Sequence, residues 1–156
     1  MKTIILGIGN PMLGDDGVGV HVVNEIKKRI QNPHITIDEA ITGGMNLLDL
    51  ILGYDKAIII DAVKSEDTHH GEVKRIVLSE FNTMHSCNPH DASLIEAIEM
   101  AEKMGETRIP QEIVIIGIMM KKVPCEFSEQ LSQEIAASVP SAVQLTLNEI
   151  KNNRNP

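Results

Sequence analysis

Residues 4–20 read Ile4-Ile5-Leu6-Gly7-Ile8-Gly9-Asn10-Pro11-Met12-Leu13-Gly14-Asp15-Asp16-Gly17-Val18-Gly19-Val20, and they change from a strand pattern to a helical pattern. The apolar run at residues 4–8 has the length of a buried strand, and the apolar residues from Val18 onwards recur at helical spacing. The loop between the two patterns carries two adjacent aspartates. We therefore expect this loop at the C-terminal end of a buried strand, where open α/β sheets place their ligand sites.

Two phosphate-binding motifs come close to this loop, but neither is complete. The dinucleotide fingerprint G-x-G-x-x-G fails because Met12 stands where the third glycine is required. The P-loop motif fails because Asp15 and Asp16 follow Gly14 in place of Lys and Ser or Thr. Two carboxylates would also repel a polyphosphate, so the loop is better suited to a cation or a proton. Helix capping by Asp15, with Asp16 pointing into a cleft, stays open as a structural interpretation.

The composition favours a single domain over residues 1–156, without a nucleic-acid or membrane partner. The chain is long enough for one core, and its net charge of -8 without a basic cluster argues against nucleic acid. No apolar run approaches the ~20 residues of a membrane helix, and the first residues enter a strand pattern directly, so no signal peptide is expected. Cys87 and Cys125 are far apart in sequence, and we expect a reduced, cytoplasmic monomer.

The remaining pattern predicts an α/β fold, a three-layer sandwich in which helices flank a twisted, mainly parallel five-stranded sheet. The expected strands are residues 3–8, 35–38, 57–63, 72–77 and 112–119, and the expected helices are residues 17–31, 47–52, 92–104 and 128–152. Partial alternation places the strand at 72–77 on an edge of the sheet. Pro140 is expected to split or kink the last helix.

Two acids are expected at one edge of this sheet. Asp16 follows the first strand, and Asp61 is expected to end the strand at 57–63, which should be a neighbour of the first. A strand-end acid can also simply bind the amides of the next loop, so neither aspartate is decisive alone.

A histidine at a loop-to-helix junction is expected to complete the set. His90 lies just before the helix at 92–104, with Asp91 placed to cap it. One imidazole and two carboxylates form a nitrogen and oxygen ligand set that suits a divalent transition metal. The isolated Cys87-x-x-His90 unit is a weaker candidate, because zinc signatures normally need two such units.

These residues resemble the motifs of the hydrogenase maturation endopeptidases over about residues 2–150. The matching motifs are Gly7-Ile8-Gly9-Asn10-Pro11 through Asp15-Asp16-Gly17-Val18-Gly19, Gly43-Gly44-Met45-Asn46-Leu47-Leu48, Asp61-Ala62-Val63 and His90-Asp91-Ala92-Ser93-Leu94. Within the family, Pro89-His90-Asp91 followed by Ser93 resembles members that serve the deazaflavin-reducing hydrogenases of methanogens.

The resemblance implies an endopeptidase that removes a short C-terminal extension from the large-subunit precursor of a nickel–iron hydrogenase after nickel insertion. It implies Asp16, Asp61 and His90 as the catalytic and metal-contacting residues, with nickel supplied by the substrate's own active site. The family position matching Asp16 is Glu or Asp, and the shorter side chain here reaches one methylene less far. The resemblance also implies a glycine loop, and we expect Gly43, Gly44 and Met45 to bind the substrate tail.

Two mechanisms and one alternative function stay open. Nickel could polarise the scissile carbonyl or activate a water, or Asp16 or Asp61 could act as the general base while nickel only admits the substrate. The alternative function is a nickel-sensing or chaperone-like protein that binds the hydrogenase subunit without cutting it. It stays open because the sequence contains none of the standard hydrolase motifs, such as G-x-S-x-G.

Overall fold

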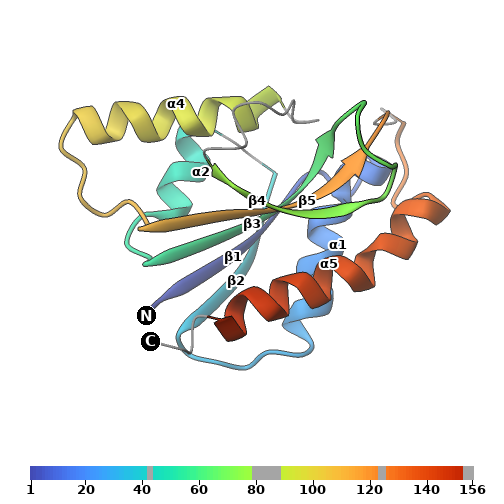
Figure 1. The fold of residues 1–156 in the computed structure, drawn as a ribbon, viewed down its shortest axis with the longest axis horizontal. Coiled ribbons are helices and arrows are strands. Elements are labelled where there is room, and N and C mark those ends of the chain that lie inside the picture. The colour runs from blue at the N-terminus through green and yellow to red at the C-terminus, as the bar shows by residue number, and fades with distance from the viewer. Residues whose placement is uncertain (42–43, 79–88, 123–125, 153–156) are drawn as a thin grey trace.

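A five-stranded sheet with helices on both faces makes up most of the computed structural model, which describes residues 1–41, 44–78, 89–122 and 126–152 (Figure 1). The side chains of residues 44–45 and 89–93 are outside that description. The elements in chain order are β1 (Thr3–Ile8), η1 (Gly14–Gly17), α1 (Val18–Lys27), β2 (Ile35–Ala40), α2 (Gly44–Ile51), β3 (Lys56–Lys64), β4 (Val73–Val77), α4 (Pro89–Lys103), β5 (Glu112–Met120) and α5 (Gln133–Asn152).

The strands are arranged in the order β2-β1-β3-β5-β4, and all neighbours are parallel except β4 and β5. The position of β4 at an edge confirms the prediction from its partial alternation. The pairing of β1 with β3, which sets Leu6 opposite Ile59 and Gly7 opposite Ile60, confirms that the first and third strands are neighbours. Their C-terminal ends therefore meet at the same edge of the sheet.

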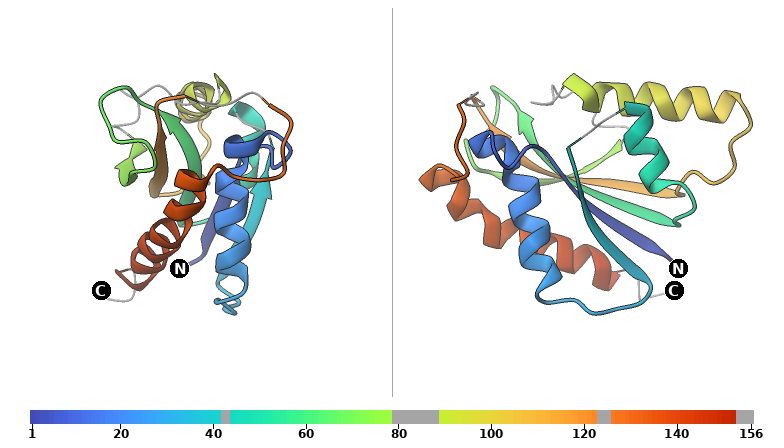
Figure 2. Two further views of the ribbon diagram at one scale, coloured as in Figure 1. Left: turned by 90° about the vertical axis from the view of Figure 1, so that its right-hand side faces the viewer. Right: turned by 180° about the vertical axis from the view of Figure 1, so that it is seen from behind.

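Alternating side chains along the strands fill two separate cores, one on each face of the sheet. On one face, odd-numbered residues of β3 such as Ile59 and Val63 pack with α2 and α4. On the other face, even-numbered residues such as Ile58 and Ile60 pack with α1 and α5. Figure 2 shows the resulting three layers edge on. The predicted three-layer α/β sandwich is confirmed.

Three predicted helix boundaries were wrong. The last helix begins at Gln133 and not at residue 128, and it continues through Pro140 without a break. Because Pro140 is exposed, the carbonyl that loses its partner at this position can be hydrated. The first helix ends at Lys27, which is earlier than expected. The helix α4 begins at Pro89, since proline is well tolerated in the first turn.

The end of the sheet at which the parallel strands terminate is called the C-terminal edge here. Loops and the first turns of helices lie close together at this end. The helices α2 and α4 both begin at this end and run back along the sheet (Figures 1 and 2). The N-terminus and the end of α5 lie towards the opposite end. Within the described residues, no helix combines the length and the apolar character needed to cross a membrane.

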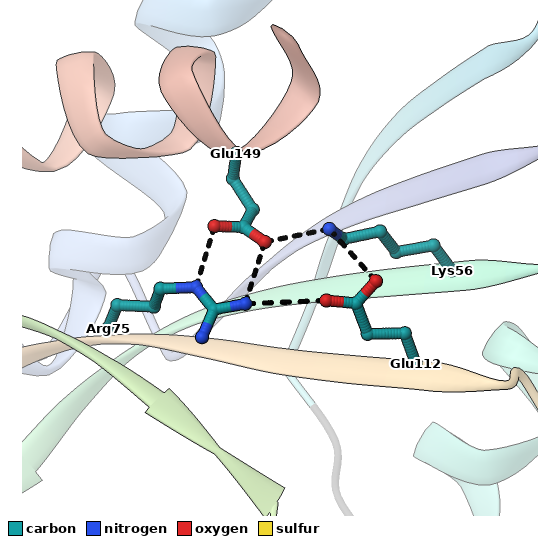
Figure 3. A network of polar contacts seen from close by, with 4 residues as sticks. All are labelled: Lys56, Arg75, Glu112 and Glu149. Atoms are coloured by element: carbon teal, nitrogen blue, oxygen red, sulfur yellow. Dashed lines mark hydrogen bonds and ion pairs between the residues drawn. The ribbon is translucent and has the colours of Figure 1, made fainter. Parts of the chain in front are cut away.

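The other end of the sheet, at which the parallel strands begin, carries a network of four charged side chains on four elements (Figure 3). Glu149 of α5 accepts hydrogen bonds from Lys56 Nζ at 2.7 Å and from Arg75 Nε at 2.7 Å. Glu112 contacts Lys56 at 3.2 Å and Arg75 at 3.3 Å. Lys56 and Glu149 are both buried, so the network fastens α5 to the sheet far from the edge described above.

Candidate functional site

The loop from Gly9 to Gly17 is folded back so tightly that glycine is required within it. Gly9 has a φ of 135°, and a Cβ at this position would collide with the Asp16 carbonyl oxygen. A Cβ on Gly19 would collide with the carbonyl oxygens of Ile8 and Ile60. These glycines therefore bring η1 and the start of α1 directly against the ends of β1 and β3. This close backbone packing explains the glycine spacing, and no bound nucleotide is needed to explain it.

The two adjacent aspartates have different surroundings. Asp15 is buried, and its Oδ1 and Oδ2 accept hydrogen bonds from the backbone N–H and the hydroxyl of Ser132 at 2.7 and 2.8 Å. The prediction that Asp15 caps the following helix was wrong, because the N-cap of α1 is Gly17 and receives no side-chain hydrogen bond. Asp15 instead anchors the segment before α5 to η1.

Sequence reasoning missed Ser132. A serine just before a helical pattern is an ordinary capping signal. Nothing in the sequence linked it to an aspartate 117 residues away.

We expect Ser132→Ala to lower the free energy of unfolding by about 1.5 to 3 kcal/mol, because it removes a hydrogen bond to a buried carboxylate. Chemical denaturation would measure the change. Ser128→Ala is a matched control, since the Ser128 hydroxyl bonds only within its own exposed turn, and it should change stability much less. Equal losses in the two variants would contradict the anchoring role of Ser132.

Asp16 is held by the loop but keeps one oxygen available. Its Oδ2 accepts the backbone N–H of Asn10 at 2.8 Å, and Asn10 Oδ1 in turn accepts the N–H of Met12 at 3.0 Å. Asp16 is only partly buried. The turn η1 that carries Asp16 packs against β3, the strand that carries Asp61. The fold therefore brings together the turn and the strand that carry the two predicted acids.

Asp61 is the most unusual polar residue of the described chain. It is 2% exposed, and neither carboxylate oxygen has a hydrogen-bond partner among the residues that the structure describes. The prediction that Asp61 ends its strand was wrong, because β3 continues to Lys64 through its pairing with β5. Asp61 lies opposite Gly117 in that pairing. A buried carboxylate without a partner is costly, and such a group is expected to meet a cation or a proton that the described residues do not supply.

The other predicted site residues lie at the same edge or outside the description. His90 is the second residue of α4, so the predictions that it precedes the helix and that Asp91 caps it were wrong. The His90 side chain is not among the described ones. Gly44 opens α2 and Met45 follows it, while Gly43, Cys87 and Cys125 lie outside the described residues.

The donor set at this edge suits a hard or borderline divalent cation. Carboxylate oxygens of Asp16 and Asp61 are ordinary ligands for such ions, and an imidazole would add a nitrogen donor. Among the side chains that the structure describes, no group of three or more His, Cys, Asp or Glu residues could hold a metal. Asp16 and Asp61 are therefore potential donors, and the described side chains do not by themselves form a metal site.

Comparison with known proteins gives a consistent result. The sequence profile of the family described as hydrogenase maturation protease HycI matches residues 20–149, which include Asp61 and His90. A Methanocaldococcus jannaschii protein with the provisional name of hydrogenase maturation protease is 29% identical over 153 residues, which cover 95% of this chain and 96% of the relative. The hydrogenase 2 maturation protease of Escherichia coli is 25% identical over 150 residues, which cover 94% of this chain and 89% of the relative.

Solved structures share the fold over almost the whole chain. The hydrogenase maturating endopeptidase HybD from E. coli superimposes with a TM-score of 0.85 at 24% identity, covering 99% of this chain and 94% of that one. The [NiFe] hydrogenase maturation protease HybD from Thermococcus kodakarensis superimposes with a TM-score of 0.74 at 26% identity, covering 95% of this chain and 98% of that one.

Proposed function

The chain belongs to the hydrogenase maturation protease family, and on this premise we propose that it removes the C-terminal extension of a nickel–iron hydrogenase large-subunit precursor after nickel insertion. The names of its relatives favour an endopeptidase over a protein that binds the precursor without cutting it. We also propose that the protein is a monomer and that it acts in the cytoplasm.

The observation that carries this proposal is the unpartnered carboxylate of Asp61 beside the turn of Asp16. Both oxygens of Asp61 are buried, and no described residue neutralises them. A metal that enters with the substrate would relieve this cost only in the complex. The precursor would then bind tightly only when its nickel is in place, which makes Asp61 a checkpoint for nickel insertion.

In the proposed mechanism, Asp16, Asp61 and His90 contact the nickel that the substrate's cysteines hold. Nickel in this position would act as a Lewis acid that polarises the scissile carbonyl or lowers the pKa of a water. Hydrolysis adds a water to the carbonyl carbon and breaks the amide C–N bond, and the water's proton passes to the leaving amine. The loop fixes Asp16 through the Asn10 N–H, so this carboxylate needs little reorganisation when the substrate arrives.

A second mechanism uses the same residues differently. Asp16 or Asp61 would take the proton from the attacking water, and nickel would only admit the substrate. Residual cleavage of a nickel-free precursor, supplied at a concentration high enough for it to bind without nickel, would favour this mechanism. In both mechanisms, Gly43, Gly44 and Met45 are proposed to lie along the substrate tail.

The direct test is incubation with purified nickel-loaded precursor, followed by mass spectrometry of the large subunit. Precursors of several hydrogenases, including a deazaflavin-reducing one, should be compared. We expect loss of one defined C-terminal peptide from the matching precursor and none from its nickel-free form. Stable binding of every nickel-loaded precursor without cleavage would overturn the proposal and favour the non-cleaving alternative.

We expect the thiols to be dispensable for cleavage. Cys87→Ser and Cys125→Ser should each keep the processing rate within about twofold, because a mechanism based on carboxylates, imidazole and metal needs no cysteine of the protease. Alkylation of the purified protein before mixing with precursor should likewise leave the rate unchanged. Cleavage that stops after alkylation of Cys87, while the precursor still binds, would require a thiol nucleophile instead.

A further inference from the structure

Two large apolar side chains are exposed on adjoining segments at the candidate site. Met12, in the loop before η1, is 56% exposed, and Phe127, between β5 and α5, is 86% exposed. Phe127 is the most exposed large apolar side chain among the described residues. Single exposed apolar residues are normal on protein surfaces, but neighbouring ones at a functional site indicate a contact surface.

Backbone hydrogen bonds hold these two residues next to each other. The Ser128 N–H donates to the Met12 carbonyl at 2.9 Å, and the Gly14 N–H donates to the Ser128 carbonyl at 2.7 Å. Leu13 and Ser128 form a parallel bridge, so the preceding pair in that register is Met12 and Phe127. This register places the backbones of Met12 and Phe127 side by side, and both side chains are exposed.

The support beneath this pair is rigid. Asp15 binds both polar groups of Ser132, which ties the segment after Phe127 to η1 (Figure 2). The Gln130 N–H donates to the Ser128 hydroxyl at 3.1 Å and closes the turn between them. A preorganised apolar surface loses little conformational entropy when a partner binds.

We infer that Met12 and Phe127 form an apolar docking pair for the C-terminal segment of the hydrogenase precursor. This inference rests on the proposed function. Met12 precedes Asp16 by four residues in the same tight loop, so a peptide bond that reaches Asp16 belongs to a segment that passes the pair. The two carboxylates of the site offer no apolar contact, and the docking pair supplies it.

The charge of the chain argues against two other occupants. A net charge of -8 disfavours an anionic membrane surface, and two copies of the chain would repel each other. The precursor segment is therefore the occupant that fits the position of the docking pair next to the turn of Asp16.

The test compares two double variants in binding and in cleavage of the nickel-loaded precursor. The first carries Met12→Ser and Phe127→Ser. The matched control carries Met100→Ser and Met104→Ser, which replace an exposed methionine on α4 and another just after its end. We expect the first variant to raise both Kd and KM by about tenfold or more while kcat and Tm change little. The control should match the wild type, and a variant with Met12→Leu and Phe127→Leu should keep the binding of the wild type.

The two readouts separate failure of the docking inference from failure of the proposed function. Unchanged Kd and KM in the first variant, or an equal change in the control, would overturn the docking pair. Binding without cleavage by the wild type would overturn the proposed function and leave the pair supported by Kd. A wild-type dimer that the first variant dissociates, measured by sedimentation, would overturn the inference and assign the pair to self-association.

Discussion

Asp61→Asn should reduce cleavage of the nickel-loaded precursor by on the order of a thousandfold, because it replaces the buried carboxylate whose two oxygens have no hydrogen-bond partner among the described residues. An amide of the same shape neither binds a metal as an anion nor accepts a proton from water. The rate of appearance of the shortened large subunit measures the effect. Asp49→Asn is the matched control, since Asp49 is an exposed aspartate on α2.

The same variant should not be less stable than the wild type. A buried charge without a partner opposes folding, so neutralising it should raise Tm by about 2 to 4 °C, which corresponds to roughly 1 kcal/mol in a chain of this length. An inactive variant that melts higher would assign Asp61 to function rather than to structure. A large drop in Tm, or full activity, would contradict this role.

Asp16→Asn is expected to be inactive for a related reason while leaving the loop intact. The amide oxygen of asparagine can still accept the Asn10 N–H, so the contact that holds the loop survives the substitution. The negative charge of the Asp16 carboxylate is lost, and with it the proposed contact to the metal.

Local apolar patterns were sufficient to predict the sheet, because each buried strand is a short run of mostly apolar residues. Residues 57–63 and 112–119 read as buried strands, and both are recovered with one or two added residues. The added residues depend on the partner strand. Lys64 joins β3 because it pairs with Met120 of β5, and its polar side chain gave no local strand signal.

The sequence predicted Asp16 and Asp61 as candidate acids, but it did not predict the different hydrogen-bond partners of Asp15 and Asp16. Sequence reasoning placed Asp16 and Asp61 at one sheet edge because parallel strands end together. It proposed Asp15 as a helix cap and gave no sign of its actual partner Ser132, which lies 117 residues away. The start of α4 at Pro89 had a local signal, because proline is frequent at the first helical position.

Glu149→Ala should lower the free energy of unfolding by about 3 kcal/mol, which corresponds to a Tm lower by roughly 6 to 12 °C. Glu149 is the buried acid of the network in Figure 3, and its loss removes one of the two acids of that network that contact buried Lys56. Glu112→Gln is the control, and the exposure of that side chain limits its effect to about 0–1 kcal/mol. Because the network lies at the edge opposite Asp61, activity per folded molecule should be unchanged in both variants.

Acid should weaken the contribution of Glu149. The Arg75 guanidinium, with help from Lys56, holds the pKa of this carboxyl at about 2 in the folded chain, against an ordinary value of 4.5. A carboxyl whose pKa is lowered by folding stabilises the fold fully above its unfolded pKa and loses that contribution as the pH falls. The stability difference between wild type and Glu149→Gln should therefore be constant above about pH 5 and shrink between 4.5 and 2. Urea denaturation across this range measures it, and a difference that stayed constant down to pH 2 would show that the charge of Glu149 does not account for it.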